Sequence, residues 1–432
     1  MAAKRSGVSG DAWHDTFERY QILDKVAEQG YADITADEMR VFREPRLMSK
    51  IDHQEQLPKI FSDNKLSILT LSRKAFRIGK FDIFENLPEW ELPGKDVETL
   101  PFPTNLETLD FKNITGEPGV INTAYATEML QRFTEQDLVL TVSGRMTSGD
   151  FNYTVNTFDS APQAIQVSKA QIEIDAAYEG DKGFFIFEVK NHMSKDFNMR
   201  QLYYPFRTWQ ERIQKPTNTV FLTLSNDVFD LYQYQFENVT DFSSGSLIKH
   251  KRYMLSHTDP KESDLVAKAK KSIGAKPKTK ETFPQANGFA RVIDLVSFLL
   301  EAPRTVEDLT NNYAFDPRQS DYYYVAARYL GLATSAQGDG GVQYRQATPL
   351  AREIFSKGYK EKTQALAELL LGIDTVAQLY LQTVISGSLP NGEEATRIFA
   401  ASSDSQGISG DTISRRAQVA LSWVKWLRAI AV

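Results

Sequence analysis

Residues 171–191 of the chain have the sequence QIEIDAAYEGDKGFFIFEVKN, and this stretch decides the fold of the segment around it. Apolar and polar residues alternate before the tetrapeptide GDKG at 180–183, and an almost continuous apolar run follows it. Two such runs joined by a short, glycine-flanked turn are typical of a β-hairpin. With the turn centred on Asp181 and Lys182, the residue numbers of every cross-strand pair add up to 363.

This register brings charged side chains together on one face of the hairpin. Asp175 lies opposite Glu188, and Glu173 lies opposite Lys190, with Cβ atoms about 4.5–5.5 Å apart in such pairs. Two facing carboxylates destabilise a strand pair unless a cation lies between them, and their oxygens suit a divalent cation such as Mg²⁺. Lys190 then positions or deprotonates a water, or stabilises charge on a phosphate group. An exposed face of cross-strand ion pairs is the alternative interpretation, but it leaves Asp175 facing Glu188 without a reason.

The order of Asp175, a spacer of twelve residues and Glu188-Val189-Lys190 resembles the PD-(D/E)xK nuclease motif. The resemblance implies that Asp175 and Glu188 bind the metal and that Lys190 is the catalytic lysine. Ile174 stands where the motif has its proline, a departure that is common in the family. Two strands followed by a helix and a further strand resemble the nuclease core of type II restriction endonucleases. The fold class implied is therefore α/β, with a PD-(D/E)xK mixed-sheet core.

Composition limits the chemistry that the chain can support. There are 432 residues, with no Cys and only five His, so a cysteine nucleophile is excluded and a structural zinc site is disfavoured. Any metal must rest on oxygen ligands, which points to Mg²⁺, with Mn²⁺ as a substitute. The glycine-rich phosphate-binding motifs of nucleotide enzymes are missing, so no nucleotide cofactor is expected. The net charge of −6 argues only against non-specific coating of nucleic acid.

Hydrophobic patterning predicts neither a membrane span nor a secretion signal. No run approaches the roughly 18–20 consecutive apolar residues that cross a bilayer. The N-terminal residues 1–7 are polar and lack the apolar core of a signal peptide. We therefore expect a cytoplasmic protein with no membrane partner.

The chain is long enough for several domains. Residues 1–110 predict an N-terminal mixed α/β domain that contributes to DNA recognition, and residues 111–255 predict the nuclease core. The lysine-rich stretch 256–287 predicts a flexible linker. In residues 288–432, three helical segments precede a hairpin that turns at 338–341, which is the order of a winged helix-turn-helix. Compact helical units with a hairpin also occur outside nucleic-acid binding, so this last domain is described as winged-helix-like.

Further residues are candidates for a supporting role. Glu128, on a helix predicted from Thr123 to Phe133, is a candidate additional acid, as is Glu173. A polar turn at 143–150 and the helix after Lys190 carry hydrogen-bonding side chains that suit DNA contact. The candidate DNA-binding residues are Ser143, Arg145, Thr147, Ser148, Arg200 and Gln201. An ordinary solvated surface is the alternative for each of them.

Together these features predict a Mg²⁺-dependent, sequence-specific endonuclease that cuts double-stranded DNA, as a type II restriction enzyme does. One active site cuts one strand, so a homodimer is expected. Two alternatives remain. One is a repair or modification-dependent nuclease on the same core, and the other is a non-catalytic DNA-binding regulator.

Overall fold

The structure is a computed structural model of the whole chain, and it describes residues 8–91, 96–101, 106–110, 114–255, 261–277, 279–312, 317–338, 342–357 and 359–431. The chain divides into two compact units. Unit 1 comprises residues 1–89, 120–223 and 229–252, and unit 2 comprises residues 90–119, 224–228 and 253–432. Unit 1 therefore holds the N-terminal part together with the hairpin at 171–191.

The N-terminal part of unit 1 combines short helices with a three-stranded sheet. Its elements are α1 (Val8–Tyr20), α2 (Ile22–Gln29), β1 (Tyr31–Thr35), α3 (Ala36–Arg40), α4 (Pro45–Ser49), α5 (Lys59–Asp63), β2 (Ser67–Thr70) and β3 (Ala75–Gly79). The strands are antiparallel in the order β1-β3-β2. Trp13, Phe17 and Phe61 pack edge to face in the core, with ring centroids 4.8 to 6.1 Å apart.

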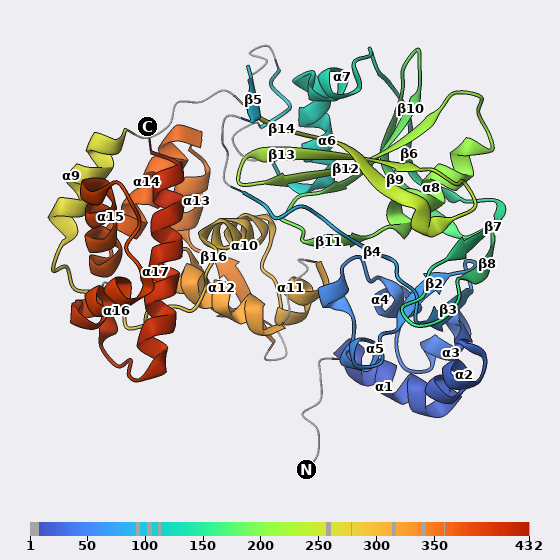
Figure 1. The fold of residues 1–432 in the computed structure, drawn as a ribbon, viewed down its shortest axis with the longest axis horizontal. Coiled ribbons are helices and arrows are strands. Elements are labelled where there is room, and N and C mark those ends of the chain that lie inside the picture. The colour runs from blue at the N-terminus through green and yellow to red at the C-terminus, as the bar shows by residue number, and fades with distance from the viewer. Residues whose placement is uncertain are drawn as a thin grey trace. The chain divides into compact units, whose positions relative to one another are not determined.

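A mixed sheet forms the centre of unit 1. The strands of this sheet that lie mainly in unit 1 are β6 (Val139–Thr147), β9 (Gln171–Glu179), β10 (Phe184–Lys190), β12 (Thr217–Ser225), β13 (Val228–Phe236) and β14 (Gly245–Leu255). They lie in the order β14-β13-β12-β10-β9-β6 (Figure 1). Strand β10 is antiparallel to β9 and parallel to β12, so the mixed α/β class that the sequence predicts is confirmed.

Helices cover both faces of this sheet. On one face lie α6 (Gly116–Ala126) and α7 (Met129–Thr134), where Tyr125 stacks on Tyr178 of β9 at 5.1 Å. On the other face lies α8 (Arg200–Gln210). Near its C-terminal end, the ring of Trp209 packs against the ring of Phe184 of β10, with the ring centroids 5.1 Å apart. Strands β10 and β12 are parallel, so the chain must cross back from the end of one to the start of the other, and helix α8 lies in this connection. Two small two-stranded sheets complete the unit: β7 (Asp150–Val155) with β8 (Gln163–Ser168), and β4 (Phe84–Asn86) with β11 (Asp196–Asn198).

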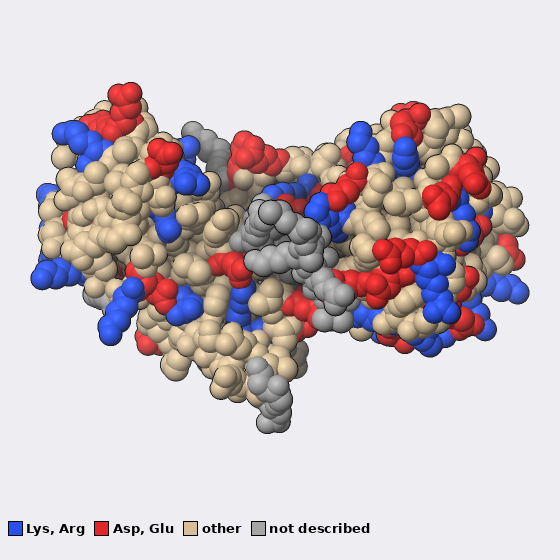
Figure 2. Space-filling view, turned by 90° about the horizontal axis from the view of Figure 1, so that it is seen from below, with Lys and Arg blue, Asp and Glu red and all other residues tan. Residues whose placement is uncertain are grey.

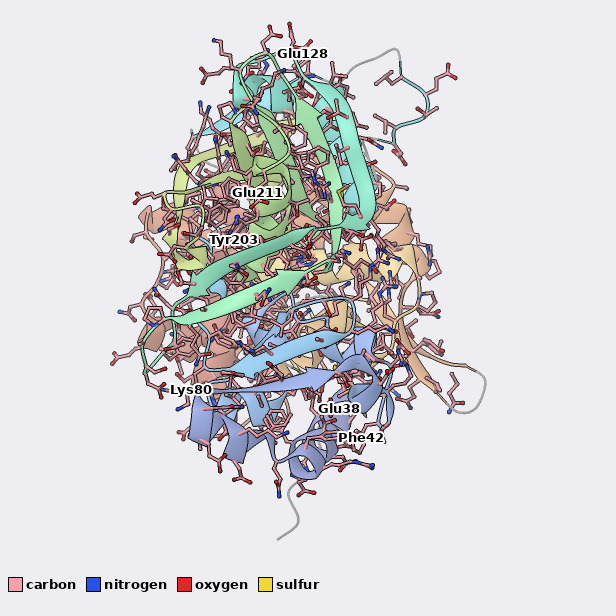
Figure 3. The ribbon with its side chains drawn as sticks, turned by 90° about the vertical axis from the view of Figure 1, so that its right-hand side faces the viewer. Glu38, Phe42, Lys80, Glu128, Tyr203 and Glu211 are labelled. Atoms are coloured by element: carbon pink, nitrogen blue, oxygen red, sulfur yellow. The ribbon has the colours of Figure 1, made fainter. Side chains whose placement is uncertain are left out.

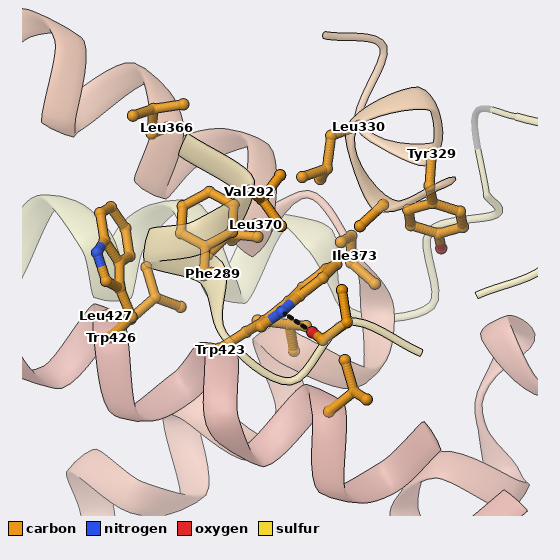
Figure 4. Packing of buried hydrophobic residues seen from close by; sticks show 14 of the residues in the cluster. Phe289, Val292, Tyr329, Leu330, Leu366, Leu370, Ile373, Trp423, Trp426 and Leu427 are labelled. Atoms are coloured by element: carbon orange, nitrogen blue, oxygen red, sulfur yellow. Dashed lines mark hydrogen bonds between the residues drawn. The ribbon is translucent and has the colours of Figure 1, made fainter. Parts of the chain in front are cut away.

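Unit 2 is built mainly from helices. They are α9 (Glu262–Ser272), α10 (Phe289–Glu301), α11 (Val306–Asn312), α12 (Pro317–Tyr329), α13 (Pro349–Phe355), α14 (Tyr359–Leu371), α15 (Asp374–Ser386), α16 (Gly392–Ala401) and α17 (Asp411–Ala429). Strand β5 (Val97–Leu100) and the hairpin of β15 (Ala333–Gln337) and β16 (Gln343–Ala347) complete its elements. Trp423 lies at the centre of the core, where its indole N–H donates to Ala286 O at 3.0 Å and its ring packs near Phe289 (Figure 4).

The segment expected to be a linker takes part in this core. Residues 262–272 form α9, and Leu265 and Ala269 on it are fully buried against the other helices of unit 2. The lysines at its C-terminal end, Lys270 and Lys271, lie where positive charge stabilises a helix. The prediction of a flexible linker is wrong for these residues, because a high lysine content is found in amphipathic helices as well as in linkers.

Three helices followed by a hairpin occur in unit 2 in the predicted order, α10, α11, α12 and then β15 with β16. Arg304, in the segment before α11, pairs with Arg345 of β16 as an isolated antiparallel bridge. The segment before α11 therefore lies beside β16 of the hairpin. The glycines at 340 and 341 in the predicted turn lie outside the described residues, as does Asp339. Within the described ranges, no single helix is long and apolar enough to cross a membrane. One pair of consecutive helices, residues 361–371 and 374–386, is long and apolar enough when taken together, but it is bent by 107°.

Replacing Asp404 with Ala should destabilise unit 2 by about 3 kcal/mol. The buried carboxylate accepts hydrogen bonds from the Thr375 N–H and hydroxyl, both at 2.8 Å, and from the Tyr329 hydroxyl at 3.2 Å. Buried donors left without acceptors cost about 1–3 kcal/mol each. Urea denaturation followed by tryptophan fluorescence measures the loss. Asp404→Asn should cost less, and the exposed Glu361→Ala should cost almost nothing; equal losses in all three would contradict this account.

Candidate active site

Glu188 and Lys190 lie side by side on a central strand of the sheet. Residues two apart on a strand project from the same face, and β10 is flanked by β9 and β12. Glu188 is 9% exposed and Lys190 is 6% exposed. Lys190 Nζ donates to Glu188 Oε1 at 2.5 Å. Burying two charges is costly unless they are paired, so this strand carries an arrangement that packing alone would not favour.

Asp175 joins this pair through the backbone of β10. The predicted register is confirmed from Phe184↔Glu179 to Phe187↔Ala176, and the regular ladder between the two strands ends there. Beyond it, Asp175 Oδ2 accepts a hydrogen bond from the Val189 N–H at 2.7 Å. Instead of facing Glu188 across a regular ladder, Asp175 is bound to the peptide between Glu188 and Lys190. The three motif residues therefore meet, although by a different contact from the one expected.

Gln201, in the first turn of α8, extends the site. Its Nε2 donates to Glu188 Oε1 at 2.5 Å, which places the amide beside both Glu188 and Lys190. The Gln201 Oε1 atom is buried and, among the described residues, has no hydrogen-bond partner. A buried acceptor without a donor costs free energy, so a donor or a cation at this position would stabilise the site.

The oxygen atoms of this site suit a hard divalent cation. Within the described residues no group of three His, Asp or Glu side chains forms a metal cage by itself. The set available is two carboxylates, Asp175 and Glu188, together with the orphaned oxygen of Gln201. All of these are oxygen donors, which Mg²⁺ and Mn²⁺ prefer.

Asp52, from the N-terminal part of unit 1, belongs to the same neighbourhood and was not anticipated from the sequence. The Asn198 N–H donates to Asp52 O at 2.7 Å, and the Asn198 side-chain amide donates to Ile51 O at 3.1 Å. His53 Nδ1 lies 2.6 Å from Asp196 O. These bonds fix the loop after α4 to β11, just before α8 begins, and the Asp52 side chain is 13% exposed.

The charge state of Asp52 shows what surrounds it. Burial is the largest influence and would raise the pKa of its carboxyl, but the positive charges of Lys190 and Lys50 oppose it. With smaller contributions from His53 and Arg200, these charges lower the pKa below its usual value. Asp52 is therefore an ionised carboxylate within the electrostatic reach of the Lys190 ammonium.

The two candidate additional acids lie elsewhere. Glu128 separates α6 from α7 in a left-handed conformation (φ 61°), so the single predicted helix from Thr123 to Phe133 is broken at this residue. It is exposed, and Figure 3 shows it at one end of the unit, whereas Tyr203 in α8 lies near the middle. Glu173 pairs with Arg145 of β6 at 3.2 Å and not with Lys190. The ladder between β9 and β10 covers only residues 176–179 of β9, whereas the ladder between β9 and β6 pairs Glu173 with Arg145.

The predicted turn at 143–150 is mostly strand. β6 continues through Thr147, with register shifts and a glycine at φ 91° (Gly144), and β7 begins at Asp150. Ser143, Arg145 and Thr147 are therefore part of the edge strand of the central sheet, and Ser148, which is buried, lies in the short turn that follows. The glycines that suggested a loop serve as a bulge and a tight turn in this strand pair.

Arg200 begins α8 next to Gln201. Its backbone N–H donates to Asn198 Oδ1 at 3.1 Å, and its guanidinium lies 5.8 Å from the centre of the Tyr204 ring. Because Arg200 also acts on the Asp52 carboxylate, the first turn of α8 brings a second positive charge to the site besides Lys190.

Three family models match successive segments of the chain, and each is described as a domain of unknown function. They are DUF6996 over residues 10–78, DUF6997 over residues 79–254 and DUF7226 over residues 291–431. The second segment contains the hairpin and Gln201, and the first contains Asp52. No curated protein and no solved structure matches the chain.

Substituting Arg145 with Ala should leave stability almost unchanged, because its ion pair with Glu173 is about half exposed on both sides and such pairs contribute at most about 1 kcal/mol. If Arg145 recognises a base, the variant should relax cleavage preference at one position per half-site, by roughly 1–3 kcal/mol of discrimination. Cleavage of a library of single-base site variants measures this. A uniform loss, or none, would remove Arg145 from the residues that determine specificity.

Proposed function

We propose that the chain is a metal-dependent endonuclease with a PD-(D/E)xK core that cuts double-stranded DNA at specific sequences. One observation carries the proposal: Glu188 and Lys190 are paired and buried on β10, and Asp175 is bound to the peptide between them. The hairpin, the helix α8 and the parallel strand β12 follow one another as the resemblance to this superfamily implies.

Each residue of the site has a role in hydrolysing a phosphodiester. Asp175 and Glu188 would hold the divalent cation, which when bound lowers the pKa of water and neutralises charge on the phosphate. Lys190 stabilises negative charge that develops on the phosphate oxygens. Gln201 fixes the Glu188 carboxylate by a hydrogen bond, so the acid keeps one orientation as substrate enters.

The oligomeric state follows from the chemistry. One constellation of Asp175, Glu188 and Lys190 cuts one strand, so cleavage of both strands at one site requires two copies. We propose a homodimer on the DNA.

Incubation with phage DNA tests the proposal. Discrete fragments should form with Mg²⁺ or Mn²⁺, while Ca²⁺ should support binding without cleavage and excess EDTA should abolish it. Smeared products would favour a repair or modification-dependent nuclease. A mobility shift with no cleavage under any metal would favour a DNA-binding regulator, and undiminished cleavage in EDTA would exclude the mechanism.

A further inference from the structure

Three segments that carry basic residues come together at one corner of unit 1, although they are distant from one another in sequence. Arg73 and Lys74 lie in the turn between β2 and β3, Lys169 lies between β8 and β9, and Arg212 follows α8. We call these four residues the basic corner. All four are exposed.

The corner is held together at the turn between β6 and β7. Arg73 Nη2 donates to Thr147 Oγ1 at 2.6 Å, and Arg212 Nη2 donates to Thr147 O at 3.1 Å. The Lys169 N–H donates to Gly149 O at 2.8 Å. The turn between β6 and β7 therefore holds three segments that carry basic residues. Because these segments are already ordered, binding of a ligand there loses less conformational entropy.

In the part of the chain that the structure describes, no carboxylate lies within ion-pair distance of these four basic side chains. The acids nearest in sequence have other partners: Asp150 accepts from the Ser168 hydroxyl at 2.7 Å, and Glu211 pairs with Arg207 at 2.9 Å. On the face that Figure 2 shows, side chains of both signs are interspersed, and the net charge of the chain is −6. Four basic residues that form no ion pair within the described residues are a departure from this pattern.

We infer that the basic corner binds the phosphate backbone of the duplex that the site at Glu188 cuts, an inference that rests on the proposed function. Thr147 pairs with Gln171 on β9, four residues from Asp175 and therefore about 13 Å along the strand. Along α8, Arg212 lies eleven residues beyond Gln201, or about 16 Å. Both routes place the corner about four or five base-pair steps from the acids, within reach of the same duplex.

The test is the salt dependence of binding to a duplex of about 30 base pairs, in Ca²⁺ and between about 50 and 200 mM salt. Arg73→Glu/Arg212→Glu should weaken binding at least tenfold at low salt and flatten the slope by about 2, because each phosphate contact contributes about 0.9. Lys169→Glu, which removes no side-chain hydrogen bond of the described structure, should flatten it by about 1. The matched control is Lys25→Glu/Lys182→Glu, two exposed lysines of the same unit, and its slope should equal that of the wild type.

The outcomes separate this inference from the proposed function. If the wild-type chain cuts DNA and the corner variants keep its slope, the inference is overturned and the nuclease stands. If the wild-type chain binds duplex without cutting in Mg²⁺ or Mn²⁺, and the corner variants flatten the slope, the inference is supported and the nuclease fails. No binding of duplex by the wild-type chain overturns both.

Discussion

Glu188→Gln and Lys190→Met should each lower kcat for DNA cleavage by at least about 10²–10³, the usual cost of removing one electrostatic contact to the reacting group. Glu188→Gln keeps the size of the side chain but removes the charge that would hold the cation. Lys190→Met keeps the aliphatic stem and removes the ammonium. Binding of specific DNA in Ca²⁺ should change much less, because neither residue contributes to the basic corner.

Stability has to be separated from chemistry in these variants. Removing one partner of a buried ion pair costs about 3–5 kcal/mol, whereas replacing both with neutral side chains of similar volume is often close to neutral. The double variant Glu188→Gln/Lys190→Met should therefore unfold near the wild-type midpoint while remaining inactive.

The matched control for this experiment is Glu179→Gln/Lys215→Met. The acid of this pair, Glu179, lies on the neighbouring strand β9, the two charged groups are 2.6 Å apart, and each side chain is about 40% exposed. It should retain full cleavage and lose at most about 1 kcal/mol of stability. Cleavage near the wild-type rate by the folded Glu188/Lys190 double variant would show that the hairpin is not the active site.

The sequence predicts the hairpin register well because both determinants are local. The turn at 180–183 fixes which residues face each other, and the apolar runs on either side prevent a slip by one residue. The pairs from Phe184↔Glu179 to Phe187↔Ala176 bear this out. Local rules also govern the start of α3, where Thr35 and Glu38 exchange the hydrogen bonds of a capping box at 2.7 and 3.3 Å.

What the sequence does not predict depends on a third strand. The ladder between β9 and β10 covers only residues 176–179 of β9, whereas the ladder between β9 and β6 extends from Gln171 to Glu179, with register shifts around Val142. Glu173 therefore meets Arg145, and the Asp175 carboxylate takes the place of a backbone acceptor for the Val189 N–H. No pattern within residues 171–191 encodes the position of β6, so these two contacts could not be derived from the hairpin alone.

Asp52 is the clearest case of information that local patterns do not contain. It lies in a polar segment with no periodicity, and its approach to Lys190 depends on bonds that Asn198 and Asp196 make with residues 51–54, more than 140 positions earlier in the chain. Only the tertiary fold brings this carboxylate to the site.

Asp52→Asn should reduce kcat by about 10–100-fold with a much smaller effect on KM, the loss typical of a residue that orients a member of the active site. The substitution keeps the shape of the side chain and leaves the backbone bond from Asn198 to Asp52 O intact. It removes the negative charge that acts on Lys190. The Lys190 ammonium would then be held by Glu188 with one neighbouring anion fewer, and its position beside the phosphate would be less fixed.

Steady-state kinetics on a single-site oligonucleotide measure the effect, and Asp52→Glu should restore part of the lost kcat because it returns the charge. The matched control is Glu55→Gln, an acid of the same loop whose partner is Lys195, half exposed and outside the site. Glu55→Gln should cleave at the wild-type rate. If Asp52→Asn also does so while remaining folded, Asp52 has no role in positioning Lys190, and the N-terminal part of unit 1 supports the active site only by packing.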